Sequence, residues 1–437
     1  MKRSPYKIKL MVVGGGFAGL TLIEKLKGNS HFEITLIDRN NYNYFPPLLY
    51  QVATGFLDPA SISYPFRKLF RSSDIRFRIG SVTSIDPNSQ TLWLDQGDEL
   101  EYDILVLAAG AHTNFYGNKN IEHYSTPMKT IDDALKMRNK LLGLFERAAV
   151  AKTEEERKRL LNVVIAGGGP TGVEVAGMLA EMKQNVLRKD YPELRNDLGT
   201  VYLVEGAPNL LQPMTDRTHS KVLQIMRKLK VHVYLNTLVS DFNGKEIILN
   251  SGEKIAAETL IWAAVISANL FQGIPNEVLG KGNRIQVNGI NHVPGIPNVF
   301  ALGDMSIQTS DGHYPFGHPQ VAQVAIQQAT HLGNNLKRLA KGDAMRDFVY
   351  QPKGDLAIIG RSNAVADLIS GKLHLHGLAA LFIWLFVHLR GLVQYRNKVV
   401  TLYHWGVAYL TNDISLRMVF NDNQAKSSPE KETVDTL

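Results

Sequence analysis

The chain has 437 residues, 44% of them apolar and 20% charged, a composition typical of a folded protein with two or three domains. Its 48 Lys and Arg exceed its 41 Asp and Glu, which gives a formal net charge of +7. The sequence has no zinc-finger spacing, no RNP-type aromatic motif and no long basic run, so we expect no nucleic-acid partner. Cysteine is absent, which excludes disulfide and thiolate chemistry, and we expect no metal site.

The N-terminus has basic residues followed by the apolar run IKLMVV. This run is too short for the apolar part of a signal peptide and leads directly into glycines, so we predict a first β-strand. No stretch of about 20 apolar residues follows, and a membrane-spanning helix is therefore not expected.

Two segments share one plan: an apolar strand, a Gly-rich turn, an amphipathic helix and a second strand that ends in an acid. The first reads IKLMVV, GGGFAG, LTLIEKLKG and FEITLID, and the second reads NVVIA, GGGPTG, VEVAGMLAEMKQNVLRK and TVYLVE. Strands that are apolar throughout are typical of the centre of a parallel sheet. The repeat predicts an α/β fold with two Rossmann-like dinucleotide-binding domains.

The first loop places Gly14, Gly16 and Gly19 in the GxGxxG spacing. The first glycine permits a tight turn, the second lets a pyrophosphate approach the backbone, and the third lets helix and strand pack closely. Asp38 ends the following strand, where its carboxylate can accept hydrogen bonds from ribose hydroxyls.

The second loop repeats the spacing with Gly167, Gly169 and Gly172, and Glu205 is the corresponding acid. An acid in this place accepts both ribose hydroxyls and repels a 2′-phosphate, which favours NAD over NADP. A single GxGxxG is weak support for a nucleotide site, but two copies in strand–loop–helix context are strong support.

A third element, NVFALGD, places Gly303 and Asp304 at the end of a strand, before a helical stretch predicted from His318 to about Ala340. In an enzyme with two dinucleotide sites this acid can bond the ribitol hydroxyls of a flavin. The alternative is an ordinary N-cap or turn Asp.

With these motifs, the chain resembles the type II NADH dehydrogenases, NADH:quinone oxidoreductases of the two-dinucleotide-binding flavoprotein superfamily. GGGFAG, LAAG, GGGPTG and ALGD are superfamily motifs, whereas YFPPLLYQVATG (44–55), AQVAIQQ (322–328) and Lys372 before LFIWLFVHL are more specific. The resemblance implies non-covalent FAD in the first domain and NADH as substrate on the second. It also implies electron transfer from FAD to a membrane quinone without proton pumping.

The resemblance further implies roles for individual residues. The FAD adenosine is expected near Asp38 and the flavin near Asp304, with Ala109 and Gly110 of LAAG also at the FAD. Glu174 matches a family glutamate near the nicotinamide and flavin, and a first-turn Glu favoured by the helix dipole is the alternative.

Gln320, Gln323 and Gln327 fall at i, i+3 and i+7, one face of a predicted helix. Within AQVAIQQ, the resemblance implies that Gln323 and Gln327 line the quinone site. It also implies that Lys372 lies near the quinone headgroup, where a cation favours a forming quinol anion.

Two residues depart from the family pattern. Val265, within WAAVISAN, stands where the family commonly has glycine, and Met178 stands where many members carry glutamate. A side chain at Val265 is expected to crowd the bound nicotinamide nucleotide.

The C-terminal part contains two short apolar runs, GLAALFIWLFV and VVTLYHWGVAYL. Five basic residues lie in or beside these runs: Lys372, Arg390, Arg396, Lys398 and Arg417. Asp413 is the only acidic residue within 371–417. This pattern suits a helical segment that lies in an anionic leaflet, with Trp384, Trp405 and Tyr403 at the headgroups. A helix for dimerisation or core packing is the alternative, and deletion from residue 371 onward is expected to leave NADH-driven flavin reduction intact.

We therefore expect an FAD-binding domain from 1–122 and 268–345, an NAD-binding domain from 123–267, a membrane-anchoring region from 346–420 and a disordered tail from 421–437. The enzyme is expected as a peripheral homodimer on the cytoplasmic face of the cell membrane. The alternatives are a reductase of a soluble electron-carrier protein and a non-catalytic FAD or nucleotide sensor.

Overall fold

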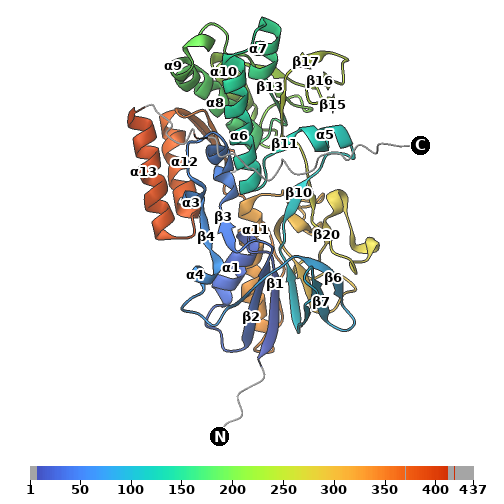
Figure 1. Ribbon diagram of the computed structural model, residues 1–437. Helices are drawn as coiled ribbons and strands as arrows, with labels where there is room; N and C mark the ends of the chain where they lie inside the picture. Colours follow the sequence, from blue (N-terminus) through green and yellow to red (C-terminus); the bar gives the residue numbers. More distant parts are fainter. Residues whose placement is uncertain (1–6, 370, 412–417, 419–437) are drawn as a thin grey trace, which may run out of the picture.

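Two five-stranded parallel sheets form the framework of the molecule, one above the other in Figure 1. The computed structural model describes residues 7–369, 371–411 and 418. The first sheet has the order β21-β9-β1-β2-β5. Its strands are β21 (Val299–Ala301), β9 (Ile104–Leu107), β1 (Ile8–Val13), β2 (Phe32–Asp38) and β5 (Arg76–Ile79).

The second sheet repeats this plan with the order β11-β18-β12-β13-β14. Its strands are β11 (Thr126–Pro127), β18 (Thr259–Trp262), β12 (Val163–Ala166), β13 (Val201–Val204) and β14 (Val231–Tyr234). In both sheets the strand before the glycine loop lies between its two parallel neighbours, and the four residues that lead into the loop are buried, as their apolar composition predicts. The α/β fold with two Rossmann-like halves is thereby confirmed.

Each half also carries a three-stranded antiparallel meander, which precedes β9 in the first half and β18 in the second. The strands are β6 (Val82–Asp86), β7 (Thr91–Leu94) and β8 (Glu99–Glu101) in the first half, and β15 (Val239–Phe242), β16 (Glu246–Leu249) and β17 (Lys254–Ala256) in the second. The halves are joined by an antiparallel pair, β10 (Ala111–Thr113) with β19 (Ile266–Ala268).

Long helices cover the sheets. In the first half they are α1 (Phe17–Leu26) and α11 (Ala322–Leu339), and in the second α6 (Ile131–Ala149), α8 (Pro170–Met182) and α10 (Asp216–Lys228). Helix α11 begins later than the sequence predicts: His318 and Gln320 lie in the preceding loop, where Pro319 precedes the N-cap Val321. The predicted stripe of three glutamines on one helix face is therefore wrong for Gln320, which lies before the helix.

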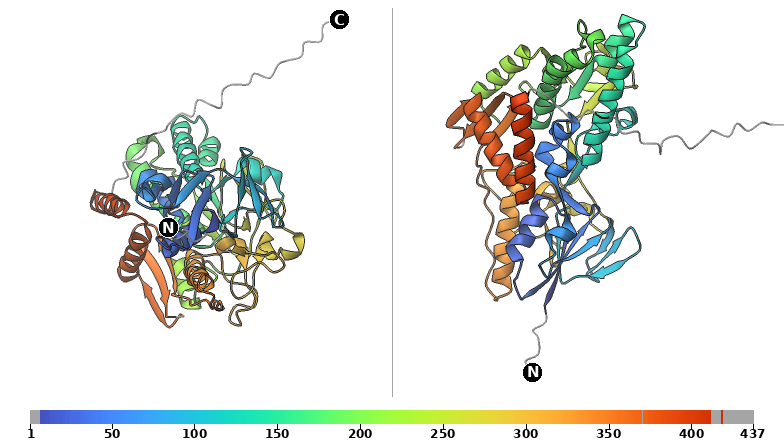
Figure 2. Two further views of the ribbon diagram at one scale, coloured as in Figure 1. Left: turned by 90° about the horizontal axis from the view of Figure 1, so that it is seen from below. Right: turned by 60° about the vertical axis from the view of Figure 1, so that its left-hand side comes forward.

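The C-terminal region opens with a sheet that the sequence did not predict. Strands β23 (Asp355–Ile359), β24 (Asn363–Leu368) and β25 (Leu373–His376) form an antiparallel sheet. It is followed by α12 (Leu378–Gly391) and α13 (Tyr395–Thr411), which lie side by side along one flank (Figure 2). The predicted helical character is confirmed for these two elements.

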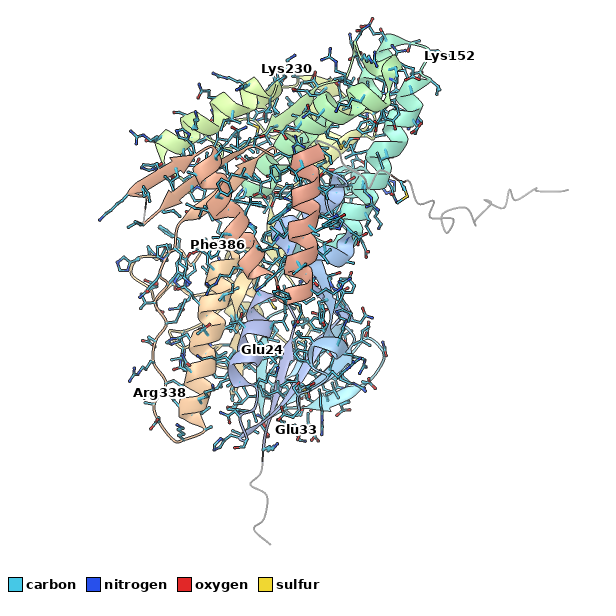
Figure 3. The ribbon with its side chains drawn as sticks, turned by 90° about the vertical axis from the view of Figure 1, so that its left-hand side faces the viewer. Glu24, Glu33, Lys152, Lys230, Arg338 and Phe386 are labelled. Atoms are coloured by element: carbon cyan, nitrogen blue, oxygen red, sulfur yellow. The ribbon has the colours of Figure 1, made fainter. Side chains whose placement is uncertain are left out.

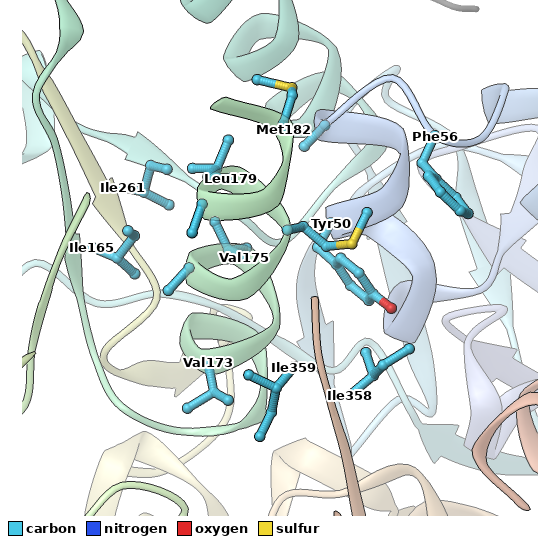
Figure 4. Close-up of a cluster of buried hydrophobic side chains, with 14 of the residues drawn as sticks. Tyr50, Phe56, Ile165, Val173, Val175, Leu179, Met182, Ile261, Ile358 and Ile359 are labelled. Atoms are coloured by element: carbon cyan, nitrogen blue, oxygen red, sulfur yellow. The ribbon is translucent and has the colours of Figure 1, made fainter. Parts of the chain in front are cut away.

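This region closes the core of the second half. Helix α8 packs so tightly on β23 that a Cβ on Gly177 would collide with the backbone nitrogen of Gly360. Figure 4 shows α8 between Ile165 and Ile261 on one side and Tyr50 and Ile358 on the other. Trp384 of α12 is fully buried in the same cluster. The C-terminal region is thus part of the folded body.

Helix α13 is held by hydrogen bonds to the first half. Asn397 Nδ2 donates to the Ser63 carbonyl at 2.8 Å, and Thr401 Oγ1 donates to the Ser61 carbonyl at 3.2 Å. Ser61 lies in α3 (Pro59–Ile62) and Ser63 opens β4 (Ser63–Pro65). Among the helices of the described ranges, none combines the length and the apolar character needed to cross a membrane.

Candidate dinucleotide and electron-transfer site

The first glycine loop follows β1 and leads into α1. Gly14 has φ +103°, and a Cβ there would collide with the Ala108 carbonyl oxygen. A Cβ on Gly19 would collide with the Gly14 carbonyl oxygen, because α1 packs directly on the loop. Gly16 is different: nothing lies within 4 Å of the position of its Cβ. The loop therefore has an open side at its second motif glycine, where a phosphate can approach the backbone.

Asp38 closes this loop. Its carboxylate accepts hydrogen bonds from the Gly15 N–H at 2.7 Å and the Asn40 N–H at 2.8 Å. Burial raises the pKa of Asp38, and these two N–H groups lower it. Asn43 supports the loop from below, since its Nδ2 donates to the Gly15 carbonyl at 2.8 Å.

The second loop, after β12, has the same geometry. Gly167 has φ +110°, a Cβ on Gly172 would collide with the Gly167 carbonyl oxygen, and Gly169 has nothing within 4 Å of its Cβ position. Glu205 accepts from the Gly168 N–H and, at 2.7 Å, from the Ala207 N–H. In both halves, the acid at the end of the second strand thus accepts one hydrogen bond from the glycine loop and one from the N–H two residues after itself.

Helix α1 at Gly16, α8 at Gly169 and α11 at Val321 begin without a side-chain cap and without an acid in the first turn, as α12 also does at Gly377. In contrast, Thr130 and Asp133 form a complete capping box on α6. An uncapped helix start leaves backbone N–H donors and the positive end of the helix dipole available to an anion. Both glycine loops therefore fit the pyrophosphate of a dinucleotide.

The LAAG and ALGD segments lie at the carboxyl ends of β9 and β21. Asn269 holds the first: its Nδ2 donates to the Ala109 carbonyl at 2.7 Å, and its N–H donates to the Gly110 carbonyl at 3.1 Å. Buried Gln328 holds the second, accepting from the Gly303 N–H at 2.8 Å. Asp304 is partly exposed and pairs with Lys129 at 3.4 Å between Nζ and Oδ2.

Glu174 lies on α8, one turn after Gly169, and 7% of it is exposed. Burial raises the pKa of its carboxyl to about 8, against the lowering effects of the Ile358 backbone N–H and the Trp384 indole. The Ile358 N–H donates to Oε1 at 3.5 Å. Glu174 therefore carries its proton at neutral pH.

Gln323 and Gln327 face the extended segment 343–354. Each carboxamide donates one hydrogen bond to the backbone of this segment and accepts one from it. Gln323 donates to the Gly354 carbonyl at 2.8 Å and accepts from the Lys353 N–H at 3.1 Å. Gln327 donates to the Gln351 carbonyl at 2.8 Å and accepts from the Gln351 N–H at 3.1 Å. Gln320 donates instead to the Asp304 carbonyl at 2.9 Å.

Strand β23 connects these glutamines to Glu174. It begins next to Gly354, and four residues further Ile358 meets Glu174, a separation of roughly 13 Å along a strand. Lys372 lies exposed in the turn between β24 and β25, at the same end of this sheet as Gly354. The structure thus places Gln323 and Lys372 toward one end of the sheet and Glu174 toward the other.

The two departures from the family pattern have different surroundings. Val265 precedes β19 and is half-buried, and its carbonyl accepts from the Asn114 N–H at 2.9 Å. Met178 is 3% exposed in the core on α8, where a carboxylate would be desolvated. Besides Glu174, the acid on this helix is Glu181, which accepts from the Arg361 N–H at 2.7 Å.

Sequence reasoning did not identify several supporting residues: Asn43, Asn269, Gln328, Lys129 and Trp384. Asn269 stood within WAAVISAN and Gln328 within AQVAIQQ, so a search for polar residues inside these motifs would have found both. No sequence periodicity marks Asn43 or Lys129, because each contacts a residue elsewhere in the chain, Gly15 or Asp304.

Comparison with known proteins agrees with this geometry. The pyridine nucleotide-disulphide oxidoreductase family matches residues 8–329, and the NDH2 C-terminal domain family matches residues 353–411. The type II NADH:quinone oxidoreductase NdhA of Mycobacterium tuberculosis is 35% identical over 92% of this chain and 87% of its own length. The second enzyme of that bacterium, Ndh, is 33% identical over 96% of this chain and 92% of its own length.

Solved structures share the fold. NDH2 of Plasmodium falciparum, determined in complex with NADH, has a TM-score of 0.85 at 22% identity, covering 95% of this chain and 100% of its own. The sulfide:quinone oxidoreductase of Aquifex aeolicus has a TM-score of 0.73 at 20% identity, covering 94% and 96%. With both family matches and relatives aligned over nearly its whole length, this chain belongs to the type II NADH:quinone oxidoreductases, flavoproteins that carry electrons from NADH to quinone.

Proposed function

We propose that this enzyme binds FAD at the first glycine loop and NADH at the second, and passes two electrons to a membrane quinone without pumping protons. The observation that carries the proposal is the repeated open cradle: Gly16 and Gly169 each face free space at an uncapped helix start. Bound FAD supplies a two-electron carrier that NADH reduces and quinone reoxidises.

The FAD-binding domain is proposed to comprise residues 1–122 and 268–345, and the NAD-binding domain residues 123–267. Gly14, Gly16 and Gly19 would hold the FAD pyrophosphate, with Asp38 at the ribose. Further FAD contacts are proposed for Ala109, Gly110, Gly303 and Asp304, which lie at the carboxyl ends of β9 and β21. This is the edge of a parallel sheet at which ligands bind.

Gly167, Gly169 and Gly172 would hold the NADH pyrophosphate. Glu205 would accept from the ribose hydroxyls and disfavour the 2′-phosphate of NADPH. Glu174, on the helix that starts at this loop, would hold a proton beside the nicotinamide.

Quinone is proposed to react near Gln323, Gln327 and Lys372, as the AQVAIQQ motif implies. Both carboxamides already bind the backbone of the segment 343–354. A direct amide contact to a quinone carbonyl would replace one of those bonds, so these residues also shape the wall of the site.

Stopped-flow absorbance separates the two half-reactions. The purified yellow enzyme should bleach rapidly with NADH, more slowly with NADPH, and recover its colour when a soluble quinone is added. A Gly169→Val variant is the matched control, because it should keep its colour and lose bleaching. Bleaching without reoxidation by quinone would leave a carrier-protein reductase, and no bleaching at all would leave a nucleotide sensor.

We further propose that the face formed by α12 and α13 lies on an anionic lipid surface. Phe382, Phe386, Leu402, Tyr403 and Leu410 are each more than half exposed on these helices, and Figure 3 labels Phe386 on α12. Lys372, Arg390, Arg396 and Lys398 supply positive charge in the same region, whereas Arg417 and Asp413 lie outside the described residues.

The expected headgroup positions need correction. Trp384 and Trp405 are 0% and 3% exposed and pack into the core, so they are not available to lipid, whereas Tyr403 is. A homodimer and attachment at the cytoplasmic face of the cell membrane remain proposals that rest on the family resemblance. Sedimentation velocity of the enzyme in detergent measures whether it is a homodimer.

Vesicle co-sedimentation tests the lipid proposal. Replacing Phe382 and Phe386 by Glu should weaken binding to anionic vesicles by more than about tenfold, since each inserted ring contributes ~1.5–3 kcal/mol. Tyr116→Glu with Val150→Glu is the control, because both side chains are more than two-thirds exposed elsewhere on the molecule. Equal binding by the two double variants would exclude α12 as the lipid-facing element.

A further inference from the structure

The indole N–H of Trp384 is a buried donor that completes no hydrogen bond. Its ring is 0% exposed, and its indole Nε1 makes no hydrogen bond to any of the described residues. A desolvated N–H left unpaired costs about 1–3 kcal/mol, so such a group needs a physical reason.

The acceptor beside this indole is the carboxyl of Glu174. Trp384 lies on α12 and Glu174 on α8, and strand β23 packs against both helices, with its Ile358 N–H at the Glu174 carboxyl. The indole acts on this carboxyl from α12 and lowers its pKa. No cation pairs with Glu174 among the described salt bridges, and the Ile358 N–H is its other donor, at a long 3.5 Å. Hydrogen bonds from these two donors to a neutral carboxyl are weak and long, whereas hydrogen bonds to a carboxylate are shorter and stronger.

We propose that Trp384 is a positioning residue for Glu174: its indole N–H completes a hydrogen bond to the carboxylate when Glu174 is ionised. This inference deepens the proposed function, because it rests on Glu174 lying beside the nicotinamide. It makes α12, an element of the C-terminal region, part of the machinery that sets the charge of that acid.

The surrounding groups leave this role to Trp384. Tyr50 of α2 (Leu49–Ala53) lies near Glu174, but its hydroxyl bonds Gln51 Nε2 at 2.8 Å and makes no hydrogen bond to Glu174 among the described contacts. Burial raises the pKa of Tyr50, and of Tyr409 on α13, so both stay neutral.

His388 stacks on the Trp384 ring at 3.8 Å between centroids. Burial lowers its pKa to about 4, so it adds no positive charge near neutral pH. From β23, only the Ile358 N–H acts on Glu174. Asp355 at the start of that strand and Arg361, two residues past its end, do not act on it.

Infrared difference spectroscopy of the FAD-loaded enzyme, without NADH, measures Glu174 directly. The C=O stretch of its protonated carboxyl is assigned by its loss in Glu174→Gln. In the unchanged enzyme this band should disappear as the pH rises through about 8. Trp384→Phe keeps a ring but lacks the N–H. In this variant the midpoint of the Glu174 titration should move up by about one pH unit, which is a tenfold fall in the ionisation constant.

Trp405→Phe is the matched control for lost indole packing in the same cluster. Its Nε1 donates to Gln51 Oε1 at 2.8 Å, and not to Glu174. This variant should titrate like the unchanged enzyme. An unchanged midpoint in a folded Trp384→Phe protein, or an equal shift in both variants, would overturn the proposal.

A second measurement needs no variant of the core. The chain has 4 Trp, so ¹⁵N-indole labelling gives few resonances. The Trp384 Nε1–H signal should move downfield with the midpoint of the Glu174 band, and a constant signal across that titration would also overturn the proposal. If NADH fails to bleach the flavin while both titrations behave as expected, the proposed function fails and the Trp384 inference stands.

Discussion

The glycines of the two loops meet two separate requirements. Gly14, Gly19, Gly167 and Gly172 are required by packing, because a Cβ at any of them collides with a backbone carbonyl group. Gly16 and Gly169 have free space instead, so the folded chain itself does not require glycine there. What requires it is a ligand that comes close to the backbone.

Substitutions at these positions should therefore separate folding from binding. Gly16→Val should lower the unfolding free energy of the FAD-free protein by only about 1 kcal/mol, because Val is a poorer N-cap residue than Gly, yet lower FAD affinity more than tenfold. Urea denaturation and retained flavin after gel filtration measure the two quantities. Gly19→Ala is the contrast: it should destabilise the FAD-free protein itself. A Gly16→Val enzyme with full flavin content would contradict the assignment.

Glu174 predicts a pH dependence of stability. Its pKa is raised by burial from 4.5 to about 8, so the folded state binds a proton that the unfolded state releases. The stabilising effect is complete below pH 4.5 and is lost as the pH rises through about 8. Over the whole transition Glu174→Gln should remove about 5 kcal/mol of pH dependence, because each pKa unit corresponds to about 1.4 kcal/mol. Chemical denaturation of both proteins at several pH values tests this, and parallel profiles would refute it.

Residues fixed by spacing were predictable from the sequence. Asp38 and Glu205 follow from the distance between a glycine loop and the end of the next strand, because the βαβ geometry allows little variation. Trp384 was not predictable. Its helix is apolar all round, with Leu381 buried and Phe382 exposed, so no periodic difference told which side faces the protein.

Among the elements, α11 has a role beyond the start of its helix. Its polar side chains bind an extended segment, 343–354, that has no strand partner in the described part of the chain. Besides the two glutamines, Asn335 donates to the Arg346 carbonyl at 2.8 Å and accepts from the Arg346 N–H at 3.0 Å. The amides thus replace a neighbouring strand and satisfy backbone groups that would otherwise be unpaired.

Asn335→Leu should therefore destabilise the protein by about 2 kcal/mol, because two hydrogen bonds are lost at a site that is 1% exposed. Asn334→Leu is the matched control: the same change one residue earlier, at an exposed position, should cost less than ~0.5 kcal/mol. Equal melting temperatures for the two variants would show that the segment is held by other contacts.

The start of α11 and the sheet before α12 show the limits of pattern reasoning for elements. AQVAIQQ indicated a helix correctly, but its first turn depends on the loop that ends at Pro319 and Val321. Strand β24 is buried at four consecutive residues and β25 at none, so neither shows the alternation of buried and exposed positions that marks a strand.

For the whole molecule, the C-terminal region is joined to both halves. Thr215, at the start of α10, donates its N–H and hydroxyl to Asp367 of β24 at 2.8 and 3.0 Å. At the other side, Asn397 and Thr401 of α13 donate to the Ser63 and Ser61 carbonyls of the first half at 2.8 and 3.2 Å. A region with such contacts behaves as part of one cooperative unit.

A chain that ends at residue 370 should then fail to fold stably, contrary to the expectation from sequence that NADH-driven reduction would survive. The deletion removes Trp384 and Trp405 from the core, and truncating a buried Trp costs ~3–5 kcal/mol each. The loss approaches or exceeds the net stability of a domain, ~5–15 kcal/mol. Differential scanning calorimetry of the truncated chain should show no cooperative transition near that of the full chain. The Phe382→Glu and Phe386→Glu double variant, altered only on the exposed face, should keep that transition, its FAD and its bleaching by NADH. A truncated protein that stays yellow and melts like the full chain would mean that the second half folds without its C-terminal cover.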